Sequence, residues 1–189
     1  MHTAASNDAT EAIVVLVKVG ANVNANNKDG TTPLQYAIYT NSQKAITTLI
    51  DAGADVNMKG LNSEPPLLYA VKGIVDGSLC GAIDKIPANT RTSLEITEAK
   101  KTIAAIVGVL VDAGAEVNTR DTNDLTALHH AAFFNTLAGT EISWILIRAG
   151  ADVNAKTTSA KFAAIRRYTL PLKGTLVRLP KHLLMQVPM

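Results

Sequence analysis

The feature that most constrains this chain is a five-residue motif that recurs along it. The motif Gly-Ala-x-Val-Asn occurs four times, beginning at Gly20, Gly53, Gly114 and Gly150. A second motif, x-Leu-x-x-Ala, keeps the same phase and begins at Pro33, Pro66 and Ala127. The first two copies of each motif lie 33 residues apart, and the later glycine spacings are 61 and 36 residues. A period of this length predicts stacked structural repeats, here with insertions of 28 and 3 residues.

The segment before each glycine has the pattern of an amphipathic helix. Apolar residues stand three and four positions before the glycine in every copy. An apolar residue seven positions before it completes a helical stripe in three copies, as Ile13, Ile46 and Val107. In the fourth copy Ser143 takes this position and Ile142 is one residue away, which predicts a slightly rotated helix.

The two motifs in phase resemble the ankyrin-repeat family, whose unit is a β-turn and two helices with a Thr-Pro-Leu-His-x-Ala signature. The best match is residues 27–59, where Asp-Gly-Thr-Thr-Pro-Leu leads to Gly-Ala-Asp-Val-Asn. Gln35 and Leu68 replace the signature histidine, and the altered turn before Pro66 makes the third finger the least well predicted. The resemblance implies an all-α ankyrin-repeat solenoid of helix-turn-helix pairs with β-turn fingers.

The period divides the chain into a repeat domain, residues 1–156, and a tail. The repeats are a truncated unit at 1–26 and three further units at 27–59, 60–120 and 121–156. Counting back 33 residues from Leu34 reaches Met1, so the first unit begins inside its first helix. Either the chain is a piece of a longer array or its first repeat is a short cap. Residues 157–189 break the pattern and are expected to be a basic, proline-containing, irregular tail.

An insertion, residues 74–100, separates the two helices of the third repeat. Gly73, Gly77 and Gly81 indicate a flexible loop at its beginning. At its far end Thr92 and Glu95 fit a capping box, and the apolar stripe predicts a second helix longer by about two turns. Such a loop either reaches a partner or is a tolerated insertion.

Charge and cysteine content narrow the function classes. Residues 1–155 carry 11 basic and 16 acidic side chains, so the repeats are poor candidates for binding a phosphate backbone. Residues 156–189 carry seven basic and no acidic side chains. The tail is therefore either a tether to nucleic acid or an anionic membrane, or a segment without selected function. The single cysteine, Cys80, and apolar runs too short to span a membrane favour a cytoplasmic location.

The sequence predicts no catalytic site, no cofactor and no metal site, so we expect no enzyme activity. It has no phosphate-binding glycine loop, and Cys80 has neither a second cysteine nor an adjacent base. His129 occupies the signature position, where the resemblance implies a structural hydrogen bond in the turn. His129 and His130 together provide too few ligands for zinc.

The resemblance implies instead a protein-binding module whose partner contacts the finger tips and the inner helices. The tip residues are Lys28, Asp29 and Thr31 in the second repeat and Thr122, Asn123 and Leu125 in the fourth. The inner-helix residues are Tyr39, Thr40, Lys72, Gly73, Phe133 and Phe134. Tyr39 and Phe133 lead this set because aromatic side chains dominate binding hot spots, whereas Phe134 is alternatively an inward-facing residue. Both ends of the array look poorly capped, which predicts self-association or marginal stability.

Overall fold

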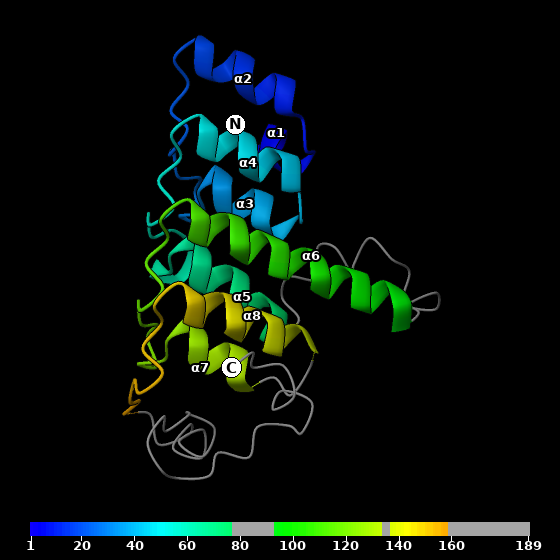
Figure 1. Cartoon of the computed structure of the whole chain (residues 1–189). Coiled ribbons are helices and arrows are strands. Elements are labelled where there is room, and N and C mark those ends of the chain that lie inside the picture. Colours follow the sequence, from blue (N-terminus) through cyan, green and yellow to red (C-terminus); the bar gives the residue numbers. More distant parts are fainter. Residues whose placement is uncertain (77–92, 134–136, 159–189) are drawn as a thin grey trace.

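The structure is a computed structural model in which the described residues form a stack of helix pairs (Figure 1). It describes the backbone of residues 1–76, 93–133 and 137–158, and the side chains of residues 1–73, 102–132 and 139–158. Within these ranges the secondary structure is eight α-helices and one short 3-10 turn, η1 (Leu61–Ser63). An isolated antiparallel bridge joins Arg120 to Thr126 at the base of a finger.

Each repeat contributes one inner and one outer helix. The inner helices are α1 (His2–Ser6), α3 (Pro33–Tyr39), α5 (Pro66–Asp76) and α7 (Ala127–Phe133). The outer helices are α2 (Thr10–Lys18), α4 (Gln43–Asp51), α6 (Ser93–Asp112) and α8 (Leu137–Arg148). Inner helices pack on inner helices and outer on outer, so the chain forms two helical layers with the fingers along one edge (Figure 1). This arrangement confirms the all-α solenoid predicted from the repeat.

Local sequence sets where the helices begin and end. Thr32 caps α3 by accepting a hydrogen bond from the backbone N–H of Gln35, and the Gln35 side chain completes a capping box. Pro33 occupies the first helical turn, where no N–H is needed. After α4, Gly53 adopts a φ of +88°, which glycine reaches without strain.

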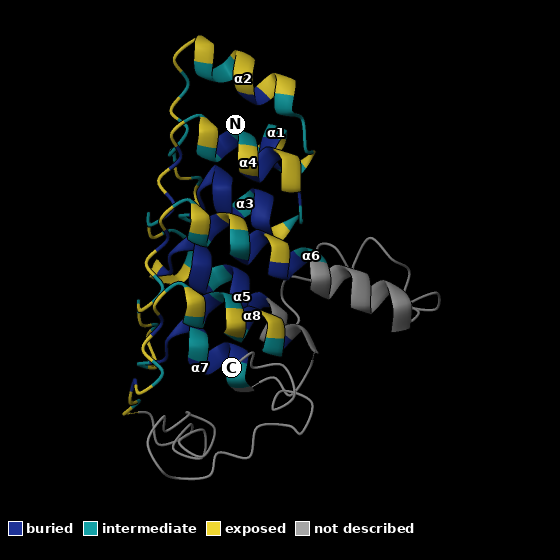
Figure 2. Ribbon diagram, viewed as in Figure 1, coloured by how far each residue is buried: buried dark blue, intermediate teal, exposed yellow. Residues whose placement is uncertain are grey.

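The core lies between the layers and repeats the same positions in each unit (Figure 2). The residue eight positions before the motif glycine is buried in repeats two to four, as Ala45, Ile106 and Ile142. The residue four positions before it is buried as Leu49, Leu110 and Leu146. Ile142 therefore occupies a regular core position, and α8 keeps the register of α4 and α6. The predicted rotation of the fourth outer helix is wrong.

The asparagine that ends each Gly-Ala-x-Val-Asn motif joins neighbouring repeats. Asn57 Oδ1 accepts a hydrogen bond from the backbone N–H of Glu116 at 2.8 Å, and its Nδ2 donates to the carbonyl of Gly114 at 3.1 Å. Asn118 makes the same two contacts with Asp152 and Gly150. Asn24 contacts Asp55 and Gly53 in the same way, so the asparagines of the first three motifs each cap the loop of the next repeat.

The insertion lengthens both helices of the third repeat. Helix α5 has 11 residues against seven in α3, and α6 has 20 against nine in α4. Gly73 is buried within α5, which corrects its prediction as a loop residue. The extension of α6 is about three turns rather than two, because 11 further residues are helical. Most of the predicted loop and tail lies outside the described residues, which leave out 77–92, with Thr92, and 159–189. The side chain of Glu95 is also outside them.

Candidate functional site

The second and fourth fingers are each built by a single polar side chain at the start of the turn. Asn27 Oδ1 accepts from the backbone N–H groups of Asp29 and Thr31, both at 2.9 Å. In the fourth repeat Asp121 Oδ1 accepts from Asn123 at 2.8 Å and from Leu125 at 2.9 Å. The two fingers therefore have the same geometry and present their middle residues to solvent.

The third finger is built differently, as its sequence suggested. Gly60 stands where the other fingers have Asn27 or Asp121, and the turn becomes η1 with Asn62 and Ser63 at positive φ. The Gln35 side chain of the preceding repeat replaces the missing cap: its Oε1 accepts from Leu61 N–H at 3.0 Å. Its Nε2 donates to the Glu64 carbonyl at 2.7 Å. Gln35 therefore takes the structural role of the signature histidine in its own repeat, and it also bonds the finger of the next repeat.

A cluster of four charged or titratable side chains lies between the inner helices α5 and α7 and the third and fourth fingers. We call it the inner charge cluster, formed by Glu64, Lys72, Asp121 and His130. Lys72 Nζ forms an ion pair with Glu64 Oε1 and lies 3.4 Å from Asp121 Oδ2. His130 Nε2 lies 3.0 Å from the same Asp121 oxygen. The Asp121 side chain is fully buried, so these contacts replace the water it would otherwise bind.

The pKa values in the cluster follow from burial opposed by pairing. Burial tends to raise the pKa of Asp121, but hydrogen bonds from the backbone of Leu125 and Asn123 and from His130 bring it below its usual value. Burial lowers the pKa of His130 and outweighs the opposing effect of Asp121. Burial also tends to lower the pKa of Lys72, yet its contacts with Glu64 and Asp121 raise it overall. The geometry favours an ion-paired Lys72 and Asp121 beside a neutral His130.

His129, next to the cluster, has the structural role that the sequence indicated. Its Nδ1 lies 2.8 Å from Thr126 Oγ1 and 3.2 Å from the Thr126 backbone nitrogen, and the residue is buried. Burial lowers its pKa, with the Ala155 backbone acting in the opposite direction. Its ring closes the fourth finger onto α7.

Aromatic side chains gather on the inner helices at the other end of the stack. The rings of Tyr36 and Tyr39 on α3 have centroids 6.4 Å apart, and the ring of His2 on α1 lies edge-on to Tyr36 at 6.1 Å. His2 is fixed there because its Nε2 lies 2.8 Å from the Thr31 carbonyl. Tyr39 is the most exposed of the three rings, at 37%. This set, the aromatic group, offers rigid apolar surface at low entropic cost.

The structure separates the predicted contact residues into surface and interior. Lys28, Asp29, Thr122 and Asn123 are exposed at finger tips. Thr31 and Leu125 are buried, because each packs under its own turn, so they are corrected to structural residues. Thr40 is half-buried, and its hydroxyl donates to the carbonyl of Tyr36 at 3.0 Å. Phe134 and the side chain of Phe133 lie outside the described residues.

Several residues of the inner face were not among the contacts predicted from the sequence. Tyr36, Tyr69 and His130 occupy one register position, two residues after the leucine of each x-Leu-x-x-Ala motif. Aligning the repeats on that leucine would have placed all three on one row of the inner face. Glu64 and Asp121 were missed because neither pairs with Lys72 at a spacing that recurs in the other repeats, and the Asp121 pair also crosses from one repeat to the next.

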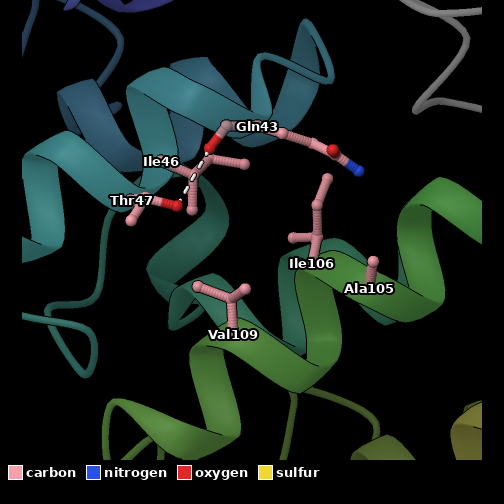
Figure 3. Close-up of a pocket in the computed structure, with 6 residues that line it drawn as sticks. All are labelled: Gln43, Ile46, Thr47, Ala105, Ile106 and Val109. Atoms are coloured by element: carbon pink, nitrogen blue, oxygen red, sulfur yellow. Dashed lines mark hydrogen bonds between the residues drawn. The ribbon is translucent and has the colours of Figure 1, made fainter.

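A shallow cavity of about 110 Å³ lies on the outer layer between α4 and α6 (Figure 3). Its walls are aliphatic apart from Gln43 and Thr47, and Val109 is exposed at its edge. The Thr47 hydroxyl donates to the Gln43 carbonyl at 3.2 Å. The cavity lining contains no titratable side chain. Across the described residues no group of three or more His, Cys, Asp or Glu is placed to hold a metal ion.

Comparison with known proteins agrees with the repeated geometry. A family model described as "Ankyrin repeats (3 copies)" matches residues 1–60, and a model described as "Ankyrin repeat" matches residues 123–158. Together they cover 96 of the 189 residues. The chain belongs to the ankyrin-repeat family. No curated protein matches it.

Ankyrin repeats generally bind other proteins and generally do not catalyse reactions. The matched residues include the aromatic group and the fourth finger from Asn123 onward, whereas the third repeat with its insertion lies between the two matches. In the described part of this ankyrin-repeat protein no helix is both long and apolar enough to span a bilayer.

Proposed function

We propose that this ankyrin-repeat protein binds another protein along its inner helices and finger tips. The observation that carries the proposal is the position of Tyr39 on the inner helix α3, an exposed ring beside the tilted ring of Tyr36. The finger of the same repeat exposes Lys28 and Asp29. A rigid aromatic anchor rimmed by charged side chains is the usual composition of a protein-binding hot spot.

The second repeat supports the proposal more strongly than the third. On α5 the equivalent of Tyr39 is Lys72, whose ammonium group pairs with Glu64 and Asp121 within the chain. A partner would have to break those pairs to use Lys72, which costs desolvation energy. We therefore propose the aromatic group as the centre of the binding surface, and Lys72 as a residue that stabilises the repeats and does not contact the partner. Phe133 has the register of Tyr39 on α7 and stays a candidate contact.

The proposal is tested by photo-crosslinking with the full chain. A photoreactive phenylalanine analogue at position 39 should capture a partner from the native cell extract, and the same analogue at position 144 should not. Trp144 is a matched control, because it is 41% exposed on the outer helix α8. The captured protein is then purified and titrated against the wild-type chain and its variants.

Tyr39→Ala combined with Phe133→Ala should weaken that binding by about tenfold or more, because loss of a hot-spot residue costs about 2 kcal/mol. Trp144→Ala and removal of residues 159–189 should leave it unchanged. Binding that depends on the tail and not on Tyr39 would contradict the proposal. We expect this interaction in the cytoplasm, since the single cysteine suits a reducing compartment.

A further inference from the structure

The outer helix α2 has an exposed apolar stripe. On the other outer helices the corresponding positions are covered by the preceding repeat. In repeats two to four, the positions eight and four before the motif glycine face the preceding repeat and are buried. Their equivalents in the first repeat are Ala12, which is exposed, and Leu16, which is half-buried. Val15 and Val19 extend the stripe and are 58% and 75% exposed. The spacing 12, 15, 16, 19 is that of one helical face.

The inner helix α1 continues the same face. Met1 and Ala4 are half-buried, whereas their equivalents Leu34 and Ala37 in the second repeat are buried. Ala5 and Ile13, which face the second repeat, are fully buried as their own equivalents are. The loss of burial is therefore confined to one side of the first repeat, at the end of the stack where Figure 2 shows α2. We call this side the end face: Met1, Ala4, Ala12, Val15, Leu16 and Val19.

The opposite end of the stack does not match it. The residues that face the next repeat are Ile13, Ile46 and Val107 on the outer helices, but the fourth repeat has Ser143. On the inner helices Ile38 and Val71 are followed by Ala132. Ser143 donates to the Gly139 carbonyl at 2.7 Å, so its hydroxyl is satisfied within α8. Head-to-tail stacking would set the end face against a surface with smaller and more polar side chains.

Two copies of the end face fit each other better. A flat apolar helix face is self-complementary about a two-fold axis. Glu11 lies at the start of α2 and Lys18 at its end, both exposed and both beside the Val15 edge of the stripe. When two α2 helices pack antiparallel, Glu11 of one copy comes within reach of Lys18 of the other. The exposed end face and the positions of Glu11 and Lys18 on α2 support the same arrangement. We propose that the end face binds a second copy of this chain, with α2 antiparallel to the α2 of that copy.

Sedimentation equilibrium of the full chain over a range of concentrations tests the dimer. We expect the mass to rise from 20.0 kDa towards twice that value. Val15→Glu places a charge in the interface and should weaken the dimer by on the order of 100-fold. Val109→Glu is the matched control, since Val109 has the same repeat position on α6 and is 36% exposed, yet lies away from the end face. It should leave the dimer intact.

Charge reversal tests the antiparallel arrangement. Glu11→Lys and Lys18→Glu should each weaken dimerisation by roughly two- to fivefold, and the double variant should restore it. In a Cys80→Ser background, Val15→Cys should form a disulfide between copies, whereas Val14→Cys should not, because it lies about 100° round the helix.

A chain that stays monomeric at every concentration overturns the proposal and leaves the end face to a helical repeat from another source. A dimer that Val15→Glu leaves intact also overturns it. Failure of the double charge variant to recover overturns the antiparallel arrangement.

Discussion

The imidazole Nε2 of His130 and the carboxylate Oδ2 of Asp121 lie 3.0 Å apart between the fourth inner helix and the fourth finger. The Asp121 side chain has no exposed surface, and that of His130 is 8% exposed. Lys72 from the third repeat shares the same oxygen at 3.4 Å. One carboxylate therefore shapes a finger, neutralises a lysine and holds a histidine of its own repeat.

The pH dependence of stability follows from the two buried histidines. Burial places the pKa of His130, and that of His129, below the value in the unfolded chain. The unfolded chain thus takes up protons first, and the free energy of unfolding falls as the pH drops below about 6.5. Urea denaturation at about pH 7.5 and about pH 5.5 measures this loss.

The variants His130→Gln and His129→Gln should each reduce that loss of stability. Gln35 already fills the position of His129 in the second repeat, so His129→Gln is compatible with the finger. Equal or greater stability of the wild-type chain at the lower pH would contradict the assignment of neutral buried histidines.

Asp121→Ala should destabilise the chain more than Asn27→Ala does. Both substitutions remove a side chain that accepts two backbone N–H groups of a finger. Only Asp121→Ala also removes the carboxylate that His130 and Lys72 share, which leaves Lys72 with Glu64 alone. We expect about 1 kcal/mol for Asn27→Ala and about 3 kcal/mol for Asp121→Ala by denaturant titration. Asp121→Asn keeps the finger bonds and should fall between them; equal losses for both alanine variants would rule out a stabilising cluster.

Gly60→Ala should destabilise the contact between repeats two and three. A Cβ at Gly60 would overlap the side-chain oxygen of Gln35, which already bonds Leu61. We expect a cost of about 1–3 kcal/mol, since a buried side chain must shift. Gly108→Ala is the contrasting variant: a Cβ there meets nothing within 4 Å, so about 0.5–1 kcal/mol of stabilisation is expected within α6.

A double-mutant cycle identifies the cause of the Gly60 effect. In a Gln35→Ala background the overlap disappears, so Gly60→Ala should cost much less than in the wild-type chain. An unchanged cost would mean that the backbone, and not Gln35, requires glycine.

Asn57→Ala should loosen the coupling between repeats. Its side chain bonds Glu116 N–H and the Gly114 carbonyl of the next unit, and each such bond contributes about 0.5–1.5 kcal/mol. Asn154→Ala is the matched control, because Asn154 is the same motif residue in the fourth repeat. Among the described residues, the Asn154 side chain has no hydrogen-bond partner, although its backbone N–H donates to Asp152. We expect about 1–2 kcal/mol and a broader unfolding transition for Asn57→Ala, with little change for Asn154→Ala. Similar effects of both variants on melting followed by circular dichroism would contradict the role of Asn57 in joining neighbouring repeats.

The regular part of the fold was predictable because it repeats. The glycine motif and the helix stripes are signals within each unit, and both recur in phase with each other. They predicted the helix pairs. The family resemblance implied the tips Lys28, Asp29, Thr122 and Asn123 and the structural bond of His129. The third finger was the least well predicted, because the turn before Pro66 departs from the family pattern. The structure adds that Gly60 lacks the capping side chain of Asn27.

What the sequence by itself determined is therefore the repeat: its period, its two helices and its turn. Tertiary structure decided what the repeats do to one another. It buried Thr31 and Leu125, brought Glu64 and Lys72 to Asp121 across two units, and continued α5 through Gly73. The physical reason is that pairs such as Gln35 with Glu64 and Lys72 with Asp121 join neighbouring repeats, at separations of 29 residues or more that only stacking brings together. A periodic pattern constrains each unit, whereas only the packed array determines which surfaces remain exposed.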